Sequence, residues 1–425
     1  MTTATTPSGG PSLAGSDFSG DQRATTLQGA TREYVDRLRG GDMGSLPAVL
    51  GLIVLFIVFT ALRPDTFPSF GNLANLTVQA GAICVLAMGL VPVLLLGEID
   101  LSAGVAGGAS AGVMAVLIND HGWPWPVAVL GAVVTGMVIG LAIGLLVARL
   151  SIPSFVVTLA FFLGVQGITL KLIGQGGTVP VRSEAIVGIA NSNVPVAAGW
   201  VLAVLVVILF AAVDLLRLRR QISHRLQHPP VALVVVRIVL VAVVVLAFTY
   251  ILNANRAHVA TFTLAGIPYV VPLVGVLLVL WTFVLGRTTY GRHVYAVGGN
   301  AEAARRAGIN VRAIRVSVFV IGSSMAALSG IVAASRLNAV TPDAGAGNTL
   351  LYAVGAAVIG GTSLFGGRGK PRDAIIGGLV IATIDNGLLL MGFDASINYM
   401  VTALVLLLAA SVDAISRRRR SATGR

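Results

Sequence analysis

Polar side chains that could hydrogen-bond to a small solute interrupt long apolar stretches at two places in the sequence. At the first, Glu98, Asp100 and Ser102 occupy every second position between two apolar segments. A carboxylate that lies at the centre of a membrane costs about 2.5–3.5 kcal/mol. Two interpretations stay open. The three residues line a path for a polar solute, or Asp100 and Ser102 cap the following helix.

At the second place, Asp385 and Asn386 lie inside the apolar run 374–391. An ionisable residue within such a run is a candidate functional residue. The alternative is an interhelical hydrogen bond that stabilises the packing of helices. The sequence therefore nominates five candidate solute-path residues: Glu98, Asp100, Ser102, Asp385 and Asn386.

A third candidate is a charged segment within residues 286–312. Gly298 and Gly299 end one element, and Asn300 is a favourable N-cap for a short helix over 301–307 that Gly308 would terminate. This helix carries Glu302, Arg305 and Arg306. It is either a contact point for a partner protein or a solvated connection.

The sequence offers no catalytic or cofactor site. Gly369-Lys370 resembles the end of a phosphate-binding loop, but Leu364 stands where the first glycine is needed and Pro371 replaces Ser or Thr. The five histidines have no metal-site spacing, and Cys84 is the single cysteine. We therefore expect no cofactor, no metal and no enzymatic activity, and any use of ATP would require another chain.

The composition is that of a membrane protein. Hydrophobic residues make up 56% of the 425 residues and charged residues 11%, whereas soluble domains have about 25% charged residues. The 51 glycines suit helices that pack closely in lipid. The net charge of +12 lies in the loops between apolar segments, which argues against binding of nucleic acid.

The expected fold is all-α: a polytopic transmembrane bundle of about twelve spans in the lipid bilayer. The spans are predicted at residues 46–62, 73–96, 102–118, 126–148, 153–173, 200–216, 231–252, 269–285, 313–335, 350–364, 374–391 and 397–415. Residues 1–45 read as a disordered cytosolic tail and 416–425 as a basic cytosolic tail, with the transmembrane domain at 46–415 between them.

The distribution of charge predicts the orientation. With both termini in the cytosol, only Arg63, Lys171, Arg182, Arg256 and Arg336 of the 29 basic residues fall in the outside segments. Residues 200–252 look like an inserted helical hairpin. Without it, five spans remain on each side, and an odd number per half permits a 5+5 inverted repeat.

Three motifs together resemble the permease subunit of monosaccharide ABC importers of the ribose and xylose type. They are Gly97–Ser102 with Ala103-Gly104, the segment from Gly298 to Asn310, and Val358 to Leu364. The resemblance covers roughly 73–102, 147–179 and 285–412. The hairpin and the long N-terminal tail are more similar to the xylose type, and Glu98 replaces a glycine that is usual in the ribose type.

The resemblance implies a homodimeric permease of the bacterial plasma membrane. An external sugar-binding protein would deliver the monosaccharide, and cytosolic ATPase subunits would drive transport. The helix 301–307, with Gly299, Asn300 and Gly308 at its ends, would then dock on the ATPase. The rival interpretation is an ion-coupled secondary transporter that uses buried carboxylates such as Asp385.

Overall fold

The computed structural model describes residue 29 and residues 44–174, 177–226, 228–257 and 263–422. Most of the predicted tail 1–45 lies outside these residues. The described chain is mainly helical, and its helices are α2 (Leu46–Leu62), α3 (Phe70–Leu95), α4 (Ala103–Asn119), α5 (Trp125–Arg149), α6 (Ser154–Ile173), α7 (Glu184–Asn191), α8 (Val196–Ser223), α9 (Val231–Asn253), α10 (Val270–Arg287), α11 (Thr289–Gly299), α12 (Ala301–Arg306), α13 (Val311–Leu337), α14 (Thr349–Gly360), α15 (Pro371–Leu390) and α16 (Ala395–Ala422).

Each of the twelve predicted spans coincides with a helix. Within the described residues, eight helices are long and apolar enough to cross a membrane, namely α3, α5, α6, α8, α9, α10, α13 and α15. The helices α2, α4 and α14 and the apolar part of α16 are shorter. The polytopic helical class is therefore confirmed, whereas the number of crossings stays a prediction.

Two short strand pairs add to the predicted all-α fold. Strand β1 (Val179–Pro180) pairs antiparallel with β4 (Ala339–Val340), and β2 (Asn193–Val194) pairs with β3 (Ile267–Pro268). Each strand has two residues, which is too short to leave an alternating pattern in the sequence.

Several helix ends differ from the predicted spans for local reasons. Helix α15 begins at Pro371, where the missing N–H costs nothing, and Asp373 Oδ2 accepts a 2.8 Å hydrogen bond from the Lys370 N–H. Helix α14 ends at Gly360 because Gly361 has a φ of +120°. Helix α16 continues through 416–422, a segment predicted as part of the tail.

The chain forms two compact units. One contains residues 200–249, which make up most of α8 and α9. In this hairpin Arg237 lies 3.3 Å from Asp214, and its guanidinium also lies over the Phe210 ring at 5.2 Å. Each of the two apolar helices carries one of these charges, and the ion pair neutralises both.

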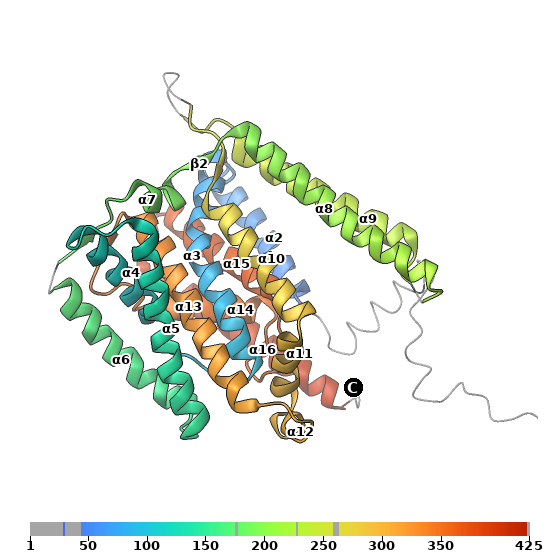
Figure 1. Cartoon of the computed structure of the whole chain (residues 1–425). Helices are drawn as coiled ribbons and strands as arrows, with labels where there is room; N and C mark the ends of the chain where they lie inside the picture. The colour runs from blue at the N-terminus through green and yellow to red at the C-terminus, as the bar shows by residue number, and fades with distance from the viewer. Residues whose placement is uncertain (1–28, 30–43, 175–176, 227, 258–262, 423–425) are drawn as a thin grey trace, which may run out of the picture. The chain divides into compact units, whose positions relative to one another are not determined.

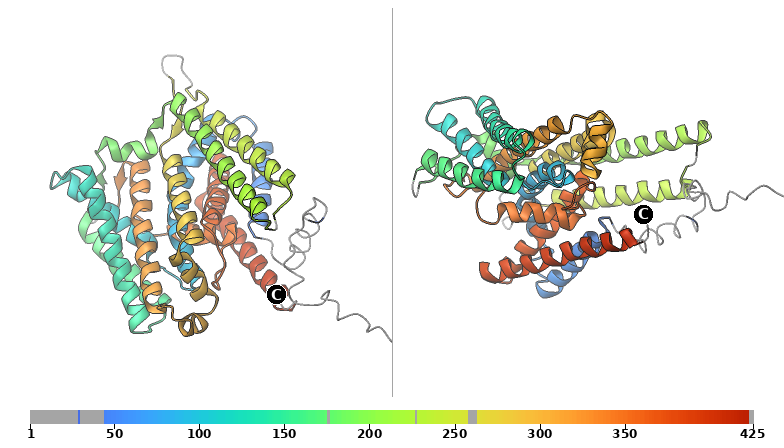
Figure 2. Two further views of the ribbon diagram at one scale, coloured as in Figure 1. Left: turned by 45° about the vertical axis from the view of Figure 1, so that its right-hand side comes forward. Right: turned by 90° about the horizontal axis from the view of Figure 1, so that it is seen from below.

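The larger unit, residues 43–199 and 250–425, is built around α3 and α13. Helix α3 packs against α10, α13, α14 and α15, and α13 packs against α3, α4 and α5 (Figure 1). Residues 85–95 of α3 are almost fully buried. Within this unit, α7 and α12 lie at opposite ends of the bundle (Figures 1 and 2). We call these the α7 end and the α12 end.

Helices α5 and α13 approach closely because α5 presents glycine at every fourth position to its neighbour. A Cβ at Gly136 would lie 2.4 Å from the Ser323 carbonyl oxygen, and one at Gly140 would lie 2.4 Å from that of Phe319. Small residues let helix backbones pack closely where no water drives association. This contact fixes α13, which carries a residue of the candidate site, Arg315, near its start.

Candidate functional site

The segment after α3 turns Glu98 and Asp100 toward different partners. Glu98 forms an ion pair with Arg315, the fifth residue of α13, with 2.8 Å between Oε1 and Nε. The Glu98 side chain is 14% exposed and that of Arg315 is 33% exposed, so the pair is partly shielded from solvent. The pair joins the end of α3 to the start of α13.

Asp100 folds back on its own turn and is 1% exposed. Its Oδ1 accepts hydrogen bonds from the Ser102 N–H at 2.9 Å and from the Ser102 hydroxyl at 2.6 Å. Asp100 rather than Ser102 therefore organises the start of α4, since the Ser102 side chain caps no backbone N–H of that helix. Within the described residues, Asp100 Oδ2 is buried without a hydrogen-bond partner.

Helix α6 anchors the same turn. The Ile99 N–H donates to the Ser154 hydroxyl at 3.3 Å, and the Thr158 hydroxyl donates to the Ile99 carbonyl at 3.3 Å. The turn between α3 and α4 is thus held by side chains of α6 and α13.

Residues at or beside the three motifs that carry the family resemblance meet at the α12 end. The Gly367 N–H donates to the Leu95 carbonyl at 2.8 Å. A Cβ on Gly298 would lie only 1.9 Å from that same carbonyl oxygen, so α11 packs directly on the last turn of α3. The Tyr295 hydroxyl donates to the Gly369 carbonyl at 2.6 Å. A displacement of α11 would therefore press on both α3 and the loop before α15.

Helix α12 has the predicted form. Asn300 Oδ1 accepts from the Ala303 N–H at 2.9 Å, and Gly308 has a φ of +84° just beyond the helix. Glu302 pairs with Arg305 and, at 3.2 Å, with Arg306. The hydrogen bonds from Arg305 and then Arg306 lower the pKa of Glu302 below its ordinary value. The cap at Asn300 is confirmed, and the helix exposes a set of paired charges.

Asp385 and Asn386 are adjacent in the sequence but contact different parts of the protein. Asn386 is buried and exchanges two hydrogen bonds of 2.9 Å with Asn72 of α3. Asn72 also donates to the Phe67 carbonyl at 2.9 Å. This geometry fits the interhelical interpretation of Asn386.

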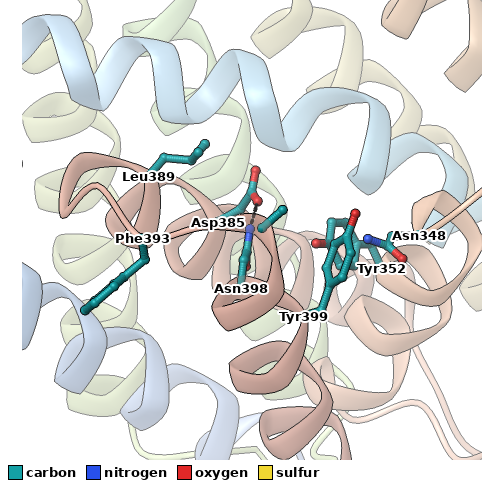
Figure 3. Close-up of a pocket in the computed structure, with 8 residues that line it drawn as sticks. Asn348, Tyr352, Asp385, Leu389, Phe393, Asn398 and Tyr399 are labelled. Atoms are coloured by element: carbon teal, nitrogen blue, oxygen red, sulfur yellow. Dashed lines mark hydrogen bonds between the residues drawn. The ribbon is translucent and has the colours of Figure 1, made fainter.

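Asp385 instead faces a pocket of about 310 Å³ (Figure 3). Its Oδ1 accepts from the Asn398 amide, and the Thr402 hydroxyl lies 3.4 Å from Asn398 Oδ1. The pocket is lined by the ends of three helices, with the residues Asn348, Tyr352, Asp385, Leu389, Phe393, Ala395, Asn398 and Tyr399. Asp385 and Asn398 lie in the middle, with Leu389 and Phe393 on one side and the two tyrosines and Asn348 on the other (Figure 3).

The structure does not bring the five candidate solute-path residues together. Glu98, Asp100 and Ser102 lie in the turn after α3, near the α12 end. Asp385 lies about 18 Å along α15 from Asp373, at a rise of about 1.5 Å per residue. Sequence reasoning missed Arg315 and Asn72 as partners, and Asn348, Tyr352 and Asn398 as pocket residues. Each of these residues is a polar side chain at or beside the start of an apolar helix, and this position could have identified them from the sequence.

Comparison with known proteins decides the class of protein. The model of the family described as branched-chain amino acid transport system / permease component matches residues 72–410. The chain belongs to this permease family. It is a transport subunit and not an enzyme, and the resemblance predicted from the three motifs is confirmed.

The permease is similar along most of its length to named sugar permeases. It is 37% identical over 372 residues to the xylose transport system permease protein XylH of Escherichia coli K12, covering 87% of this chain and 92% of XylH. XylH of Haemophilus influenzae is 33% identical over 371 residues, with 87% and 96% covered. The ribose import permease protein RbsC of Escherichia coli K12 is 28% identical over 373 residues, with 86% and 92% covered. No solved structure matches the permease significantly.

Proposed function

We propose that this chain is the permease subunit of an ABC importer that carries a monosaccharide, most similar in type to xylose permeases, across the bacterial plasma membrane. The observation that carries the proposal is the 37% identity over 92% of XylH, against 28% for RbsC. The test is uptake of several monosaccharides in a strain that lacks its own permeases. We expect xylose uptake to exceed ribose uptake. Preferred uptake of a branched-chain amino acid would contradict the proposal.

The energy for transport comes from a separate ATPase chain in this proposal. Support comes from the sequence, where Leu364 and Pro371 disrupt the one resemblance to a phosphate-binding loop. An external binding protein supplies the sugar, and two copies of the permease form the path. ATP dependence of uptake separates this mechanism from the ion-coupled transporter.

Helix α12 is the docking element for the ATPase in this proposal. It is short, capped and exposed, and α11 connects it to the end of α3 through Gly298. Movement imposed on α12 would therefore reach α3, and the Glu98–Arg315 pair would extend it to α13.

A charge-swapped variant tests this docking. Glu302→Arg combined with Arg305→Glu keeps an opposite-charge pair three residues apart, while Arg306 loses its partner at position 302. We expect lower transport and weaker association with the ATPase, with normal insertion in the membrane. Arg182→Glu, at an exposed residue near the α7 end, is the matched control. Wild-type uptake by the swapped variant would show that α12 is only a connection.

The packing of helices supports an inverted repeat. Helix α3 contacts α14 and α15, as α13 contacts α4 and α5, and the pairs α4–α5 and α4–α6 have counterparts in α14–α15 and α14–α16. Helices α2 and α10 do not follow the pattern, because α2 packs on α15 and α10 packs on α3. The proposed repeat therefore rests on the last four helices of each half.

A further inference from the structure

The pocket at Asp385 lies where the proposed repeat places its short helices. Helix α14 has 12 residues and its counterpart α4 has 17, both shorter than their neighbours α13 and α3. Short or interrupted helices in corresponding positions of two halves are the usual sign of a transporter binding site. Asn348, the residue before α14, lines the pocket, and Tyr352 lies in its first turn.

The lining combines the groups that a neutral polyhydroxylated molecule needs. The Asp385 carboxyl group can accept hydrogen bonds from hydroxyl groups, and the amides of Asn348 and Asn398 can both donate and accept. Tyr352 and Tyr399 add hydroxyl groups and flat apolar ring faces. The volume of about 310 Å³ is at the small end of the 300–1,000 Å³ range of ligand pockets.

These polar groups are not explained by lipid contact. Polar side chains at membrane depth face the bundle interior, another helix or a water-filled cavity. Asn398 is 7% exposed and Thr402 is 4% exposed, so the face of α16 that carries them packs against the protein, whereas Tyr399 is 53% exposed. Asp385 Oδ1 accepts a hydrogen bond from the Asn398 amide, which orients both side chains at the pocket.

The position along α15 fixes which half of the path the pocket serves. Asp385 is about 18 Å from the first turn of that helix, which lies beside the α12 end. If α12 faces the cytosolic ATPase, the pocket lies in the half of the membrane that faces the external binding protein.

We propose that the Asp385 pocket is the monosaccharide subsite on the external half of the permease path. This inference rests on the proposed function. The hydroxyl groups of the sugar form hydrogen bonds with Asp385, Asn398 and Asn348. The rings of Tyr352 and Tyr399 pack against the apolar faces of the sugar. Several moderate hydrogen bonds suit a transient site, because each contributes only about 0.5–1.5 kcal/mol net and lets the sugar leave.

The test uses the complete transporter in liposomes, with the permease, its ATPase and xylose-loaded binding protein. The variants are Asp385→Asn, Asn398→Ala and Tyr352→Phe, and Tyr250→Phe on α9 is the control outside the pocket. At saturating binding protein we expect xylose uptake to fall about tenfold in the first two, with stimulated ATP hydrolysis retained. Stimulated hydrolysis shows that the complex is folded and assembled.

Transport of monodeoxy sugars measures the preference for individual hydroxyl groups, which a substitution at a merely structural residue would not change. The wild-type transporter should favour xylose over each monodeoxyxylose, and Tyr352→Phe should lose several-fold of that preference for at least one analogue. The same binding protein serves every variant, so differences between variants arise in the permease. If wild type transports xylose and all pocket variants match it in rate and preference, the pocket assignment is wrong while the proposed function stands. If wild type transports no monosaccharide, the proposed function fails and this inference fails with it.

Discussion

At the scale of single residues, Asn386 shows how a polar group deep in an apolar helix can stabilise packing. Its amide exchanges two hydrogen bonds with Asn72, which links α3 to α15. Asp385, one position earlier, points into the pocket instead. Adjacent residues on a helix diverge by about 100°, so Asp385 and Asn386 face different neighbours.

We predict that Asn386→Ala lowers the stability of the permease by about 1–3 kcal/mol, because it leaves Asn72 Oδ1 without its hydrogen-bond donor. Adding Asn72→Ala should cost less than the sum of the two single changes. Thermal unfolding in detergent measures both effects. The control is Asn75→Ala, which removes an exposed amide from α3, the helix that carries Asn72. Unchanged stability with reduced uptake would instead support a place for Asn386 in the solute path.

At the scale of elements, α11 connects the exposed helix α12 to the end of α3. The contact depends on one glycine of an adjacent pair. A Cβ on Gly298 would lie 1.9 Å from the Leu95 carbonyl oxygen, whereas a Cβ on Gly299 would have no atom within 4 Å. The two glycines therefore form a matched pair for testing whether this contact transmits motion.

We predict that Gly298→Ala forces α11 away from α3, at a cost of about 1–3 kcal/mol typical of overpacking. Uptake and stimulated ATP hydrolysis should both fall. Gly299→Ala should change stability by less than about 0.5 kcal/mol and leave uptake intact. Equal behaviour of the two variants in reconstituted transporter would show that the α11–α3 contact has no role in coupling.

At the scale of the whole molecule, the asymmetry of charge predicts which end of the larger unit faces the cytosol. The α12 end carries Arg305 and Arg306 with the other basic residues of 286–312, and Arg182 lies near the α7 end. Basic loops are retained in the cytosol during insertion.

Single cysteines can test this orientation, because the native Cys84 is only 3% exposed. A membrane-impermeant thiol reagent added to intact cells should label Arg182→Cys and leave Arg306→Cys unlabelled. After the cells are permeabilised, both variants should react. Labelling of Arg306→Cys in intact cells would reverse the predicted orientation.

The sequence by itself determined the local features of this permease. Apolar length located the twelve helices that coincide with the predicted spans, because a segment in lipid must satisfy its own backbone. The cap at Asn300 and the turn at Gly308 followed from side-chain chemistry within a few residues. The motifs near Gly97, Gly298 and Gly360 identified the family, because their residue types are readable without knowing where they meet.

Only the tertiary structure decided the partners. Glu98 meets Arg315 and Asn386 meets Asn72 across hundreds of residues, and the pocket gathers side chains from α14, α15 and α16. These contacts depend on how each helix is rotated and how closely it packs on its neighbours. Hydropathy carries little of that information here, since the buried helices are mostly apolar on every face. A rotation of about 100°, one residue along the helix, separates Asn386 at a helix interface from Asp385 in a pocket.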